Sequence, residues 1–334
     1  MNIGILGAGS WGTTLAEHLH QLNHSVTLWS WSKRDVENMR ITGRNTVYMP
    51  EIAIPEKMVV TGDIGEATAG MDMLVIATPS QFVRSVLTRI PTGQLNSPYI
   101  VNVAKGIEKD SLLRMSEVVR DTLPQLPAAR YAVLSGPSHA EEVCKRRPTT
   151  VVAASSDTET ISIVIDTFMS GSFRVYASND VTGVELGGAL KNIIAIGAGI
   201  CDGSRFGDNA KAALITRGLA EIRRLGVELG ADPHTFAGLS GLGDLIVTTM
   251  SQLSRNRFVG QEIGKGRPVK EVLDSMSMVA EGVDTARAAY ELSRKHDVEM
   301  PIIRQMYEIL FNEKDPVQAT QDLMTREAKN ELWS

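Results

Sequence analysis

The segment Asn2-Ile3-Gly4-Ile5-Leu6-Gly7-Ala8-Gly9-Ser10-Trp11-Gly12 joins an apolar run to a glycine-rich turn. Asn2–Leu6 has the length and composition of a buried strand, and a helical pattern follows over Gly12–Leu22. Between them lies a G-x-G-x-x-G motif. Its glycines permit a tight turn, close approach of a pyrophosphate, and packing of the helix against the strand. The helix N-terminus offers N–H groups and a positive dipole end to phosphates. The segment predicts a dinucleotide-binding unit with contacts at Gly7, Gly9 and Gly12, the alternative being a glycine turn without a ligand.

Composition narrows the class of protein. The 334-residue chain is long enough for two domains, and it is 43% hydrophobic and 22% charged with a net charge of −5. This acidic balance lacks the positive footprint of a nucleic-acid-binding protein. Cys144 and Cys201 are expected to be free thiols in a reducing compartment. No leader-like segment is evident, and the apolar run Ile193–Ile200 is too short to span a bilayer. We expect a cytoplasmic protein without a nucleic-acid or membrane partner.

The order of the predicted elements indicates two domains. Short apolar runs alternate with helical patterns in the first half, which predicts a mainly parallel sheet covered on both faces. Beyond residue 180, helical periods follow one another without a clear strand. We expect an α/β Rossmann-type domain over 1–180 and an all-α domain over 181–334. The expected strands are Asn2–Leu6, Ser25–Trp29, Leu74–Ala77, Tyr99–Asn102, Tyr131–Leu134, Thr150–Ala153 and Phe173–Tyr176. The expected helices are Gly12–Leu22, Gln81–Ile90, Ser111–Leu123, and about 185–200, 208–229, 258–264, 268–274, 282–297 and 301–311.

The end of the second strand bears on which dinucleotide is bound. An NAD-preferring site usually carries an acidic residue there to hold the ribose hydroxyls. The segment Trp29-Ser30-Trp31-Ser32-Lys33-Arg34 has no acidic residue before Asp35. Lys33 or Arg34 can meet a 2′-phosphate, which permits NADPH, although both are equally compatible with solvated surface charges. NADPH and NADH therefore both remain open as the cofactor.

Two lysines are the best candidates for proton transfer. Lys105 follows the strand Tyr99–Asn102, and ligands of a doubly wound sheet gather outside the carboxyl ends of its strands. Lys191 lies in an apolar helix of mostly small residues, where a lone cation is costly to bury and desolvation favours the neutral amine. A group of this kind can take the hydroxyl proton when an alcohol loses a hydride. The alternative for each lysine is a side chain that reaches water.

A second polar cluster lies within Gly241–Arg257. It combines the carboxylate of Asp244 with the donors of Ser254, Arg255 and Asn256. Arginine offers a planar fork that suits phosphate oxygens, so the cluster suits a small molecule with hydroxyls and a phosphate. Further polar residues follow Lys191, and among them Asp208 is expected to cap the helix that begins near it. These residues are Asn192, Asp202, Asp208, Asn209 and Lys211.

The remaining candidates for chemistry are weaker. Five of the six histidines are expected to be structural or solvated, and His139, in a loop between apolar runs, is left open. No set of histidine, cysteine or carboxylate residues has convincing metal-ligand spacing, so no metal is expected. The five are His18, His20, His24, His234 and His296.

Taken together, these motifs resemble the bacterial NAD(P)-dependent sn-glycerol-3-phosphate dehydrogenases, a family of soluble biosynthetic oxidoreductases. The resemblance extends over nearly the whole chain and implies a helical second domain like that of 6-phosphogluconate dehydrogenase. The matching stretches are Gly7–Leu15, Ala77–Gln81, Ala104–Glu108, Leu134–Val143, Lys191–Gly203, Gly207–Leu219, Gly238–Leu245, Ser254–Arg257 and Glu281–Ala286. Departures occur at Trp31, His139 and Arg146-Arg147.

The resemblance implies a role for each matching residue. Lys191 becomes the proton acceptor in alcohol oxidation, and Lys105 helps to polarise the substrate oxygen. The implied substrate contacts are Lys105, Gly136, Ser138, Lys191, Asp244, Ser254, Arg255 and Asn256. With the residues of the glycine motif and of the second strand's end, the expected cofactor contacts are Gly7, Gly9, Ser10, Trp11, Gly12, Trp31, Lys33, Arg34, Lys105, Ala140, Arg255, Val279 and Glu281.

The activity implied by the resemblance is reversible reduction of dihydroxyacetone phosphate to sn-glycerol 3-phosphate, which supplies phospholipid synthesis. A homodimer is the expected assembly. Two alternatives stay open. A related two-domain reductase, such as a 3-hydroxyacid dehydrogenase or a ketopantoate reductase, would bind a carboxylate where Ser254–Arg257 suits a phosphate. A non-catalytic redox sensor would bind the dinucleotide but would not need both lysines.

Overall fold

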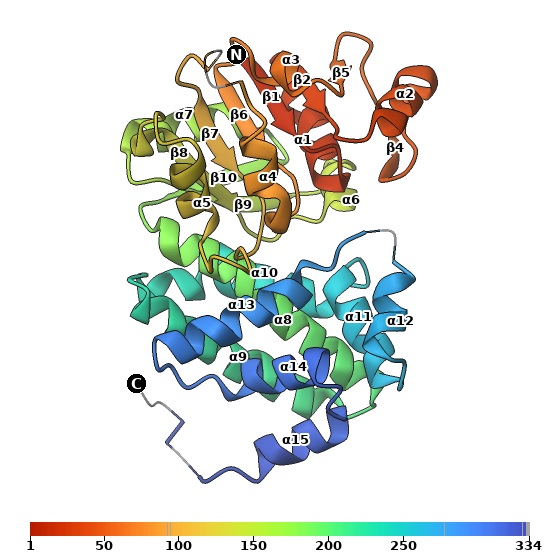
Figure 1. The fold of residues 1–334 in the computed structure, drawn as a ribbon, viewed down its shortest axis with the longest axis vertical. Coiled ribbons are helices and arrows are strands. Elements are labelled where there is room, and N and C mark those ends of the chain that lie inside the picture. Colours follow the sequence, from red (N-terminus) through yellow and green to blue (C-terminus); the bar gives the residue numbers. More distant parts are fainter. Residues whose placement is uncertain (92, 94, 277, 329, 332–334) are drawn as a thin grey trace. The chain divides into compact units, whose positions relative to one another are not determined.

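The computed structural model describes residues 1–334 except 92, 94, 277, 329 and 332–334 (Figure 1). The chain divides into two compact units. The first comprises Met1–Lys105 and Leu113–Val181, and the second comprises Gly106–Leu112 and the chain from Thr182 onward. The segment Gly106–Leu112 differs from the expected single boundary near residue 180. It belongs to the second unit because Ile107, which is fully buried, lies in that unit's hydrophobic core.

A twisted eight-stranded sheet forms the centre of the first unit, with the order β10-β9-β8-β7-β6-β1-β2-β5. Neighbouring strands are parallel except β8 and β9, which are antiparallel. The mainly parallel sheet expected from the sequence is thus confirmed. The strand order reverses beside β1, which is where a doubly wound sheet opens a crevice. The strands are β1 (Asn2–Leu6), β2 (Ser25–Trp29), β5 (Val59–Thr61), β6 (Met73–Ile76), β7 (Tyr99–Asn102), β8 (Tyr131–Ser135), β9 (Thr149–Ala154) and β10 (Phe173–Ser178).

Every strand expected from the sequence is present, with small shifts at the ends. The edge strand β5 was missed because it is only three residues long and Val59 in it is exposed. Helices cover both faces of the sheet, and β6 and β8 are buried along their whole length. The helices α2, α3, α6 and α7 were not expected. The helices of this unit are α1 (Ser10–Gln21), α2 (Lys33–Thr42), α3 (Ile64–Thr68), α4 (Val83–Leu87), α5 (Met115–Thr122), α6 (Ala140–Val143) and α7 (Thr158–Phe168).

A small antiparallel hairpin, β3 (Arg44–Asn45) with β4 (Met49–Ala53), lies apart from the main sheet. It was not expected, because its strands are short and their buried and exposed residues alternate weakly. The hairpin lies close to α1 and contributes Met49 and Ile52 to a small apolar cluster. It therefore covers part of the helix that follows the glycine-rich turn.

From Thr182 onward, the described residues of the second unit form helices joined by turns and loops, without a strand, as the sequence predicted (Figure 1). The short helix α10 and the late helix α15 were not expected. A short 3₁₀ turn over Pro233–Ala237 and a π-helical turn over Leu239–Gly243 precede α10. The helices are α8 (Val181–Gly203), α9 (Asp208–Glu228), α10 (Asp244–Met250), α11 (Arg255–Gly264), α12 (Val269–Asp274), α13 (Glu281–Lys295), α14 (Pro301–Phe311) and α15 (Pro316–Met324).

Helix α8 is the buried centre of this unit. Its 23 residues are apolar enough to cross a bilayer, which the shorter run Ile193–Ile200 did not suggest. Every residue of its apolar window is buried inside the protein, however, so its apolar character serves the core.

Glycines bring α8 and α11 into backbone contact. A Cβ at Gly199 would lie 2.0 Å from the carbonyl oxygen of Arg257, and one at Gly260 would lie 1.8 Å from that of Ile196. One turn further along α8, a Cβ at Gly203 would lie 2.2 Å from the carbonyl oxygen of Gln261. No larger side chain fits at these crossings without moving a helix, so the glycines fix where α11 lies along α8.

A buried carboxylate joins α9 to α14. Glu221 is 3% exposed and accepts hydrogen bonds from the N–H groups of Ile302, at 2.8 and 3.1 Å, and Ile303, at 3.1 Å. It thereby caps the first turn of α14 from another helix. Burial raises the pKa of Glu221 to about 7, although the two backbone donors, Arg224 and a more distant arginine lower it in part.

We predict that Glu221 makes stability depend on pH. The folded-state pKa of about 7 exceeds the ordinary value of 4.5, so the folded chain retains a proton that the unfolded chain has lost between these values. The stabilisation is therefore full below about pH 4.5 and is lost as the pH rises through about 7. Glu221→Gln should gain stability relative to the unsubstituted chain between about pH 5 and 8, measured as the free energy of unfolding in urea. The exposed Glu291→Gln is the matched control, and a pH profile of Glu221→Gln that coincides with that of the control would contradict the prediction.

Candidate active site

The glycine-rich turn between β1 and α1 has the shape that a dinucleotide requires. Gly7 has φ +127°, and a Cβ there would lie 2.7 Å from backbone atoms of Ala77, which follows β6. A Cβ at Gly12 would lie 1.8 Å from the carbonyl oxygen of Gly7. A Cβ at Gly9 would meet nothing within 4 Å, and Gly9 is the N-cap of α1 without a side-chain cap. The turn thus leaves open space in front of a helix N-terminus, which fits a pyrophosphate.

Except for Lys105, which follows β7, the other expected cofactor contacts of the first unit lie near this turn or at the end of β2. Trp11 and Ala140 pack with the same small apolar cluster, which also contains Met49 and Ile52. The hydroxyl of Ser10 donates to the carbonyl oxygen of Tyr48 at 3.1 Å.

The residues after β2 begin helix α2. Trp31 is 76% exposed, and Lys33 and Arg34 are exposed in the first turn. Ser32 caps this helix by accepting from the N–H of Asp35 at 3.2 Å. Neither Lys33 nor Arg34 forms an ion pair with a described residue. The two cations are therefore available to a 2′-phosphate.

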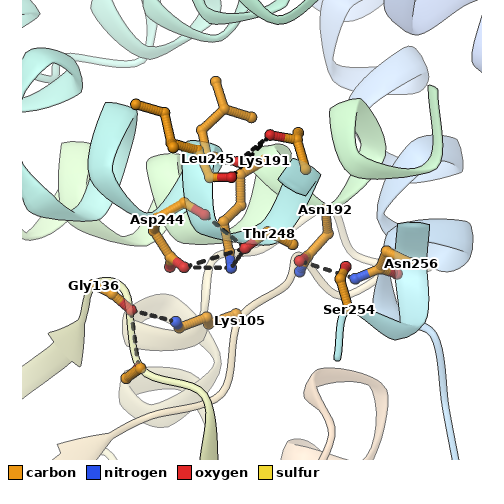
Figure 2. A network of polar contacts seen from close by, with 12 residues as sticks. Lys105, Gly136, Lys191, Asn192, Asp244, Leu245, Thr248, Ser254 and Asn256 are labelled. Carbon is orange, nitrogen blue, oxygen red and sulfur yellow. Dashed lines mark hydrogen bonds and ion pairs between the residues drawn. The ribbon is translucent and has the colours of Figure 1, made fainter. Parts of the chain in front are cut away.

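Lys105 lies beside Gly136 at the carboxyl ends of β7 and β8 (Figure 2). Ser138 contacts Gly136 in the same loop. The ammonium of Lys105 donates to the carbonyl oxygen of Gly136 at 3.0 Å, and the Ser138 hydroxyl donates to the same oxygen at 2.9 Å. Gly136 has φ +138°, and a Cβ there would lie 3.0 Å from the Cα of Val151, so only glycine fits this turn well. The side chain of Asn102 bonds both backbone groups of Ala104 and so shapes the loop that carries Lys105.

Lys191 forms a buried polar centre with Asp244 and Thr248 (Figure 2). Its Nζ lies 2.6 Å from Asp244 Oδ1 and 2.6 Å from Thr248 Oγ1. The three residues are 5%, 1% and 4% exposed. The Thr248 hydroxyl donates to the backbone carbonyl of Asp244 at 2.6 Å, so its oxygen is turned to accept from the lysine. The centre holds an ammonium group in one position inside an apolar unit.

A glycine places Asp244 against α8. A Cβ at Gly187, one turn before Lys191, would lie 2.8 Å from the carbonyl oxygen of Ser240. The π-helical turn that contains Ser240 leads directly into α10 and Asp244. The close approach therefore brings the carboxylate within reach of the lysine.

Asn192 and Asn256 connect three helices of the second unit. The amide of Asn256 donates to Asn192 Oδ1 at 3.0 Å and accepts from the N–H of Gly282 at 3.0 Å. Both asparagines are buried. Ser254 is also buried, and its hydroxyl caps α11 by accepting from the N–H of Arg257 at 3.2 Å. Ser254 and Asn256, expected as substrate contacts, thus also have structural partners that fix the start of α11.

Arg255 is the exposed residue of this cluster. Its Nη1 donates to the carbonyl oxygen of Val279 at 3.0 Å, and Val279 is 40% exposed. Glu281 follows as the first residue of α13. The structure therefore brings together three expected cofactor contacts at the N-termini of α11 and α13, where N–H groups and an arginine suit an anion.

Asp202, Lys211 and Arg257 form a cluster of ion pairs that supports α11. Asp202 accepts from Lys211 Nζ at 2.9 Å and from Arg257 at 2.6 Å. The expectation that Asp208 caps α9 was wrong, because Gly207 is the N-cap residue and Asp208 lies in the first turn. In that place its charge still favours the helix dipole.

Thr248 is the member of the lysine centre that sequence reasoning missed. The signal lay in its spacing from Asp244: residues four apart share a face of a helix, but α10 was not expected.

Among the described residues no group of histidine, cysteine and carboxylate side chains could hold a metal ion. Cys144 and Cys201 are both free, and burial raises the pKa of the Cys201 thiol to about 11.

Comparison with known proteins gives one consistent result. Models of the NAD-dependent glycerol-3-phosphate dehydrogenase family match residues 2–161 for the N-terminus and 180–321 for the C-terminus. Glycerol-3-phosphate dehydrogenase (NAD(P)+) of Syntrophotalea carbinolica is 50% identical over 99% of this chain and 100% of that protein. The enzyme of the same name from Thermoanaerobacter sp. strain X514 is 51% identical over 99% of both.

A solved structure agrees with these relatives. The crystal structure of glycerol-3-phosphate dehydrogenase from Coxiella burnetii has a TM-score of 0.92 and 40% identity, and it covers 97% of this chain and 99% of that one. The Rossmann-type fold with a helical second part is shared along essentially the whole chain. The chain belongs to the NAD-dependent glycerol-3-phosphate dehydrogenase family, whose members use NAD(P).

Proposed function

We propose that this protein reduces dihydroxyacetone phosphate to sn-glycerol 3-phosphate, and catalyses the reverse reaction, with NADH or NADPH. The observation that carries the proposal is the ammonium of Lys191 buried between Asp244 and Thr248. A buried cation with fixed partners is costly to maintain in a core, and such groups concentrate where a proton must be transferred. Relatives that are about 50% identical bear the corresponding name.

Lys191 is the proton donor of the reduction. The bound cofactor supplies the hydride to C2 of the ketone. Lys191 Nζ gives a proton to the C2 oxygen, so the carbonyl becomes a secondary alcohol, and the resulting amine takes the proton back in oxidation. Lys105 anchors the substrate or polarises the same oxygen.

Asp244 and Thr248 hold Lys191 in position for this transfer. Both distances to Nζ are 2.6 Å, and the carboxylate offsets part of the cost of burying the ammonium. Asp244, which the resemblance implies to be a substrate contact, therefore has a structural partner as well. Fixed partners reduce the rotamer freedom of a long lysine side chain, which favours one proton-transfer geometry.

Arg255 binds the substrate phosphate in this proposal. Its exposed guanidinium lies at the N-terminus of α11, where backbone N–H groups and the helix dipole add to its charge. Asn256 and Ser254 fix the first turn of α11, so the arginine starts from an ordered backbone. Ser138 and Gly136 contribute to substrate binding beside Lys105.

The product is a precursor for glycerophospholipids, and we propose that the protein works in the cytoplasm as a homodimer. The acidic net charge of −5 and the free cysteines fit this compartment. The contacts of α8 inside the second unit account for its apolar length without a membrane.

Lys191→Met is predicted to remove proton transfer while retaining the length of the side chain. We expect turnover to fall by about 10²–10⁴-fold, the range of general acid–base catalysis, while NADPH still binds. Steady-state rates followed by NADPH absorbance, with NADPH binding measured separately, check this. Lys270→Met removes an exposed lysine of the same unit and should retain turnover. Near-normal turnover of Lys191→Met would exclude Lys191 from the proton-transfer role.

At saturating NADPH, Arg255→Ala is predicted to affect the phosphorylated substrate alone. The loss of charge-assisted hydrogen bonds worth about 1.5–3 kcal/mol should lower kcat/KM for dihydroxyacetone phosphate by about 10- to 150-fold. The slow rate with unphosphorylated dihydroxyacetone should hardly change. Arg267→Ala, which removes an arginine of a surface ion pair, is the control. Equal losses with both substrates would show that Arg255 does not read the phosphate.

Replacing both Lys33 and Arg34 by Ala tests the end of β2. Because both cations are exposed, we expect the KM for NADPH to rise about tenfold and the KM for NADH to stay within twofold. Initial rates at varied concentration of each cofactor provide the comparison. Parallel changes for the two cofactors would mean that these residues do not contact the 2′-phosphate.

A further inference from the structure

One buried side chain links the hairpin of the first unit to both sides of the glycine-rich turn. Asn45 is 1% exposed, and its Nδ2 donates to the carbonyl oxygen of Ala8 and to the hydroxyl of Thr13, both at 2.8 Å. Ala8 lies within the turn, and Thr13 lies in α1 directly after Gly12. A single amide therefore sets the turn relative to the start of the helix.

The orientation of this amide is fixed by the hairpin itself. Asn45 Oδ1 accepts from the backbone N–H of Tyr48 at 3.2 Å, so the oxygen faces the hairpin and the nitrogen faces Ala8 and Thr13. The carbonyl oxygen of Tyr48 accepts in turn from the hydroxyl of Ser10. We call the segment Arg44–Ala53, which comprises β3, β4 and their connection, the strap.

The strap also packs against two expected cofactor contacts. Met49 and Ile52 of β4 are buried in a cluster with Ala140, and Trp11 packs against the same cluster. Trp11 lies in the first turn of α1, and Ala140 begins α6. The strap thus connects the glycine-rich turn, the start of α1 and the start of α6 by polar contacts on one side and apolar contacts on the other.

We propose that Asn45 is a positioning residue for the dinucleotide: it holds the Gly7–Gly12 turn in the conformation that receives the pyrophosphate. Asn45 itself touches the turn rather than the cofactor. Pyrophosphate binding depends on backbone N–H groups that cannot adjust independently, so a shift of the turn weakens several contacts at once. The proposal rests on dinucleotide binding at this turn, as the proposed function does.

Asn45→Ala is predicted to weaken binding of the cofactor and to leave the chemical step intact. The carbonyl of Ala8 and the hydroxyl of Thr13 lose a buried donor, and the turn relaxes. We expect the Kd of NADH and of NADPH, measured by calorimetry without substrate, to rise at least about tenfold. The KM for the dinucleotide should rise in parallel, while the KM for dihydroxyacetone phosphate and kcat at saturating dinucleotide stay within about twofold.

A matched variant separates positioning from general stability. Ser155→Ala deletes a buried hydroxyl that donates to the carbonyl oxygen of Tyr131 at 2.6 Å in the same unit. It should lower Tm but leave the Kd of both dinucleotides unchanged. If Asn45→Ala lowers Tm in the same way and its Kd stays within twofold of the unsubstituted chain, Asn45 is merely structural and the proposal fails.

A second pair keeps the test decisive if Asn45→Ala does not fold. Thr13→Val removes the hydroxyl that Asn45 contacts, whereas Thr13→Ser retains it. The proposal expects a higher Kd for Thr13→Val and an unchanged Kd for Thr13→Ser; equal values for both would overturn it. Binding of NADH or NADPH by the unsubstituted chain is the common reference. Binding there without turnover would count against the proposed function alone.

Discussion

An ammonium group held inside an apolar helix sets the architecture of the second unit. Lys191 lies in the middle of α8, which is buried from Gly183 to Cys201, and it is tolerable there because Asp244 and Thr248 contact its nitrogen. Removing one partner of such a pair costs about 3–5 kcal/mol, because the other charge remains buried and unpaired. The π-helical turn and the α10 residues that follow it must therefore keep a fixed position along α8. The proposed proton transfer and the folding of the unit therefore place the same demand on these elements.

This position is maintained by backbone contact as much as by side chains. Gly187 lets α8 approach the turn before Asp244, while Gly199 and Gly260 let α8 and α11 meet. The close approach brings Asn192 beside Asn256, whose amide also receives the N–H of Gly282 at the start of α13. An ordered helix start is a suitable base for Arg255, which carries the proposed phosphate contact. The buried hydrogen bonds thus hold the backbone that carries the exposed Arg255, although the asparagines do not contact its guanidinium.

In the first unit, the glycine-rich turn is also held in position by a buried polar side chain, which comes from a neighbouring hairpin. The turn must leave space for a ligand, as the open surroundings of Gly9 show, so it cannot be filled with its own side chains. The strap supports the turn from outside through Asn45 and through the apolar cluster around Met49. Lys105 is ordered similarly, by the carbonyl of Gly136 at the end of the neighbouring strand.

The sequence alone determined the class of fold and the family, and it predicted the residues of the site. These depend on local signals: strands and long helices have their own periodicity, and G-x-G-x-x-G and Ser254–Arg257 are contiguous motifs. Only the tertiary structure decided which short segments form helices or strands and which partners the polar side chains contact. The strap and α10 are short and have weak local sequence patterns. The contacts of Lys191 with Asp244 and Thr248 join residues far apart in the sequence and leave no local pattern. Asp244 is 53 residues from Lys191 and Asn45 is 37 from Ala8, so only the packed chain brings each pair together. Burial makes these contacts important for stability, because a charge or amide that is unpaired in the core cannot form a hydrogen bond to water instead.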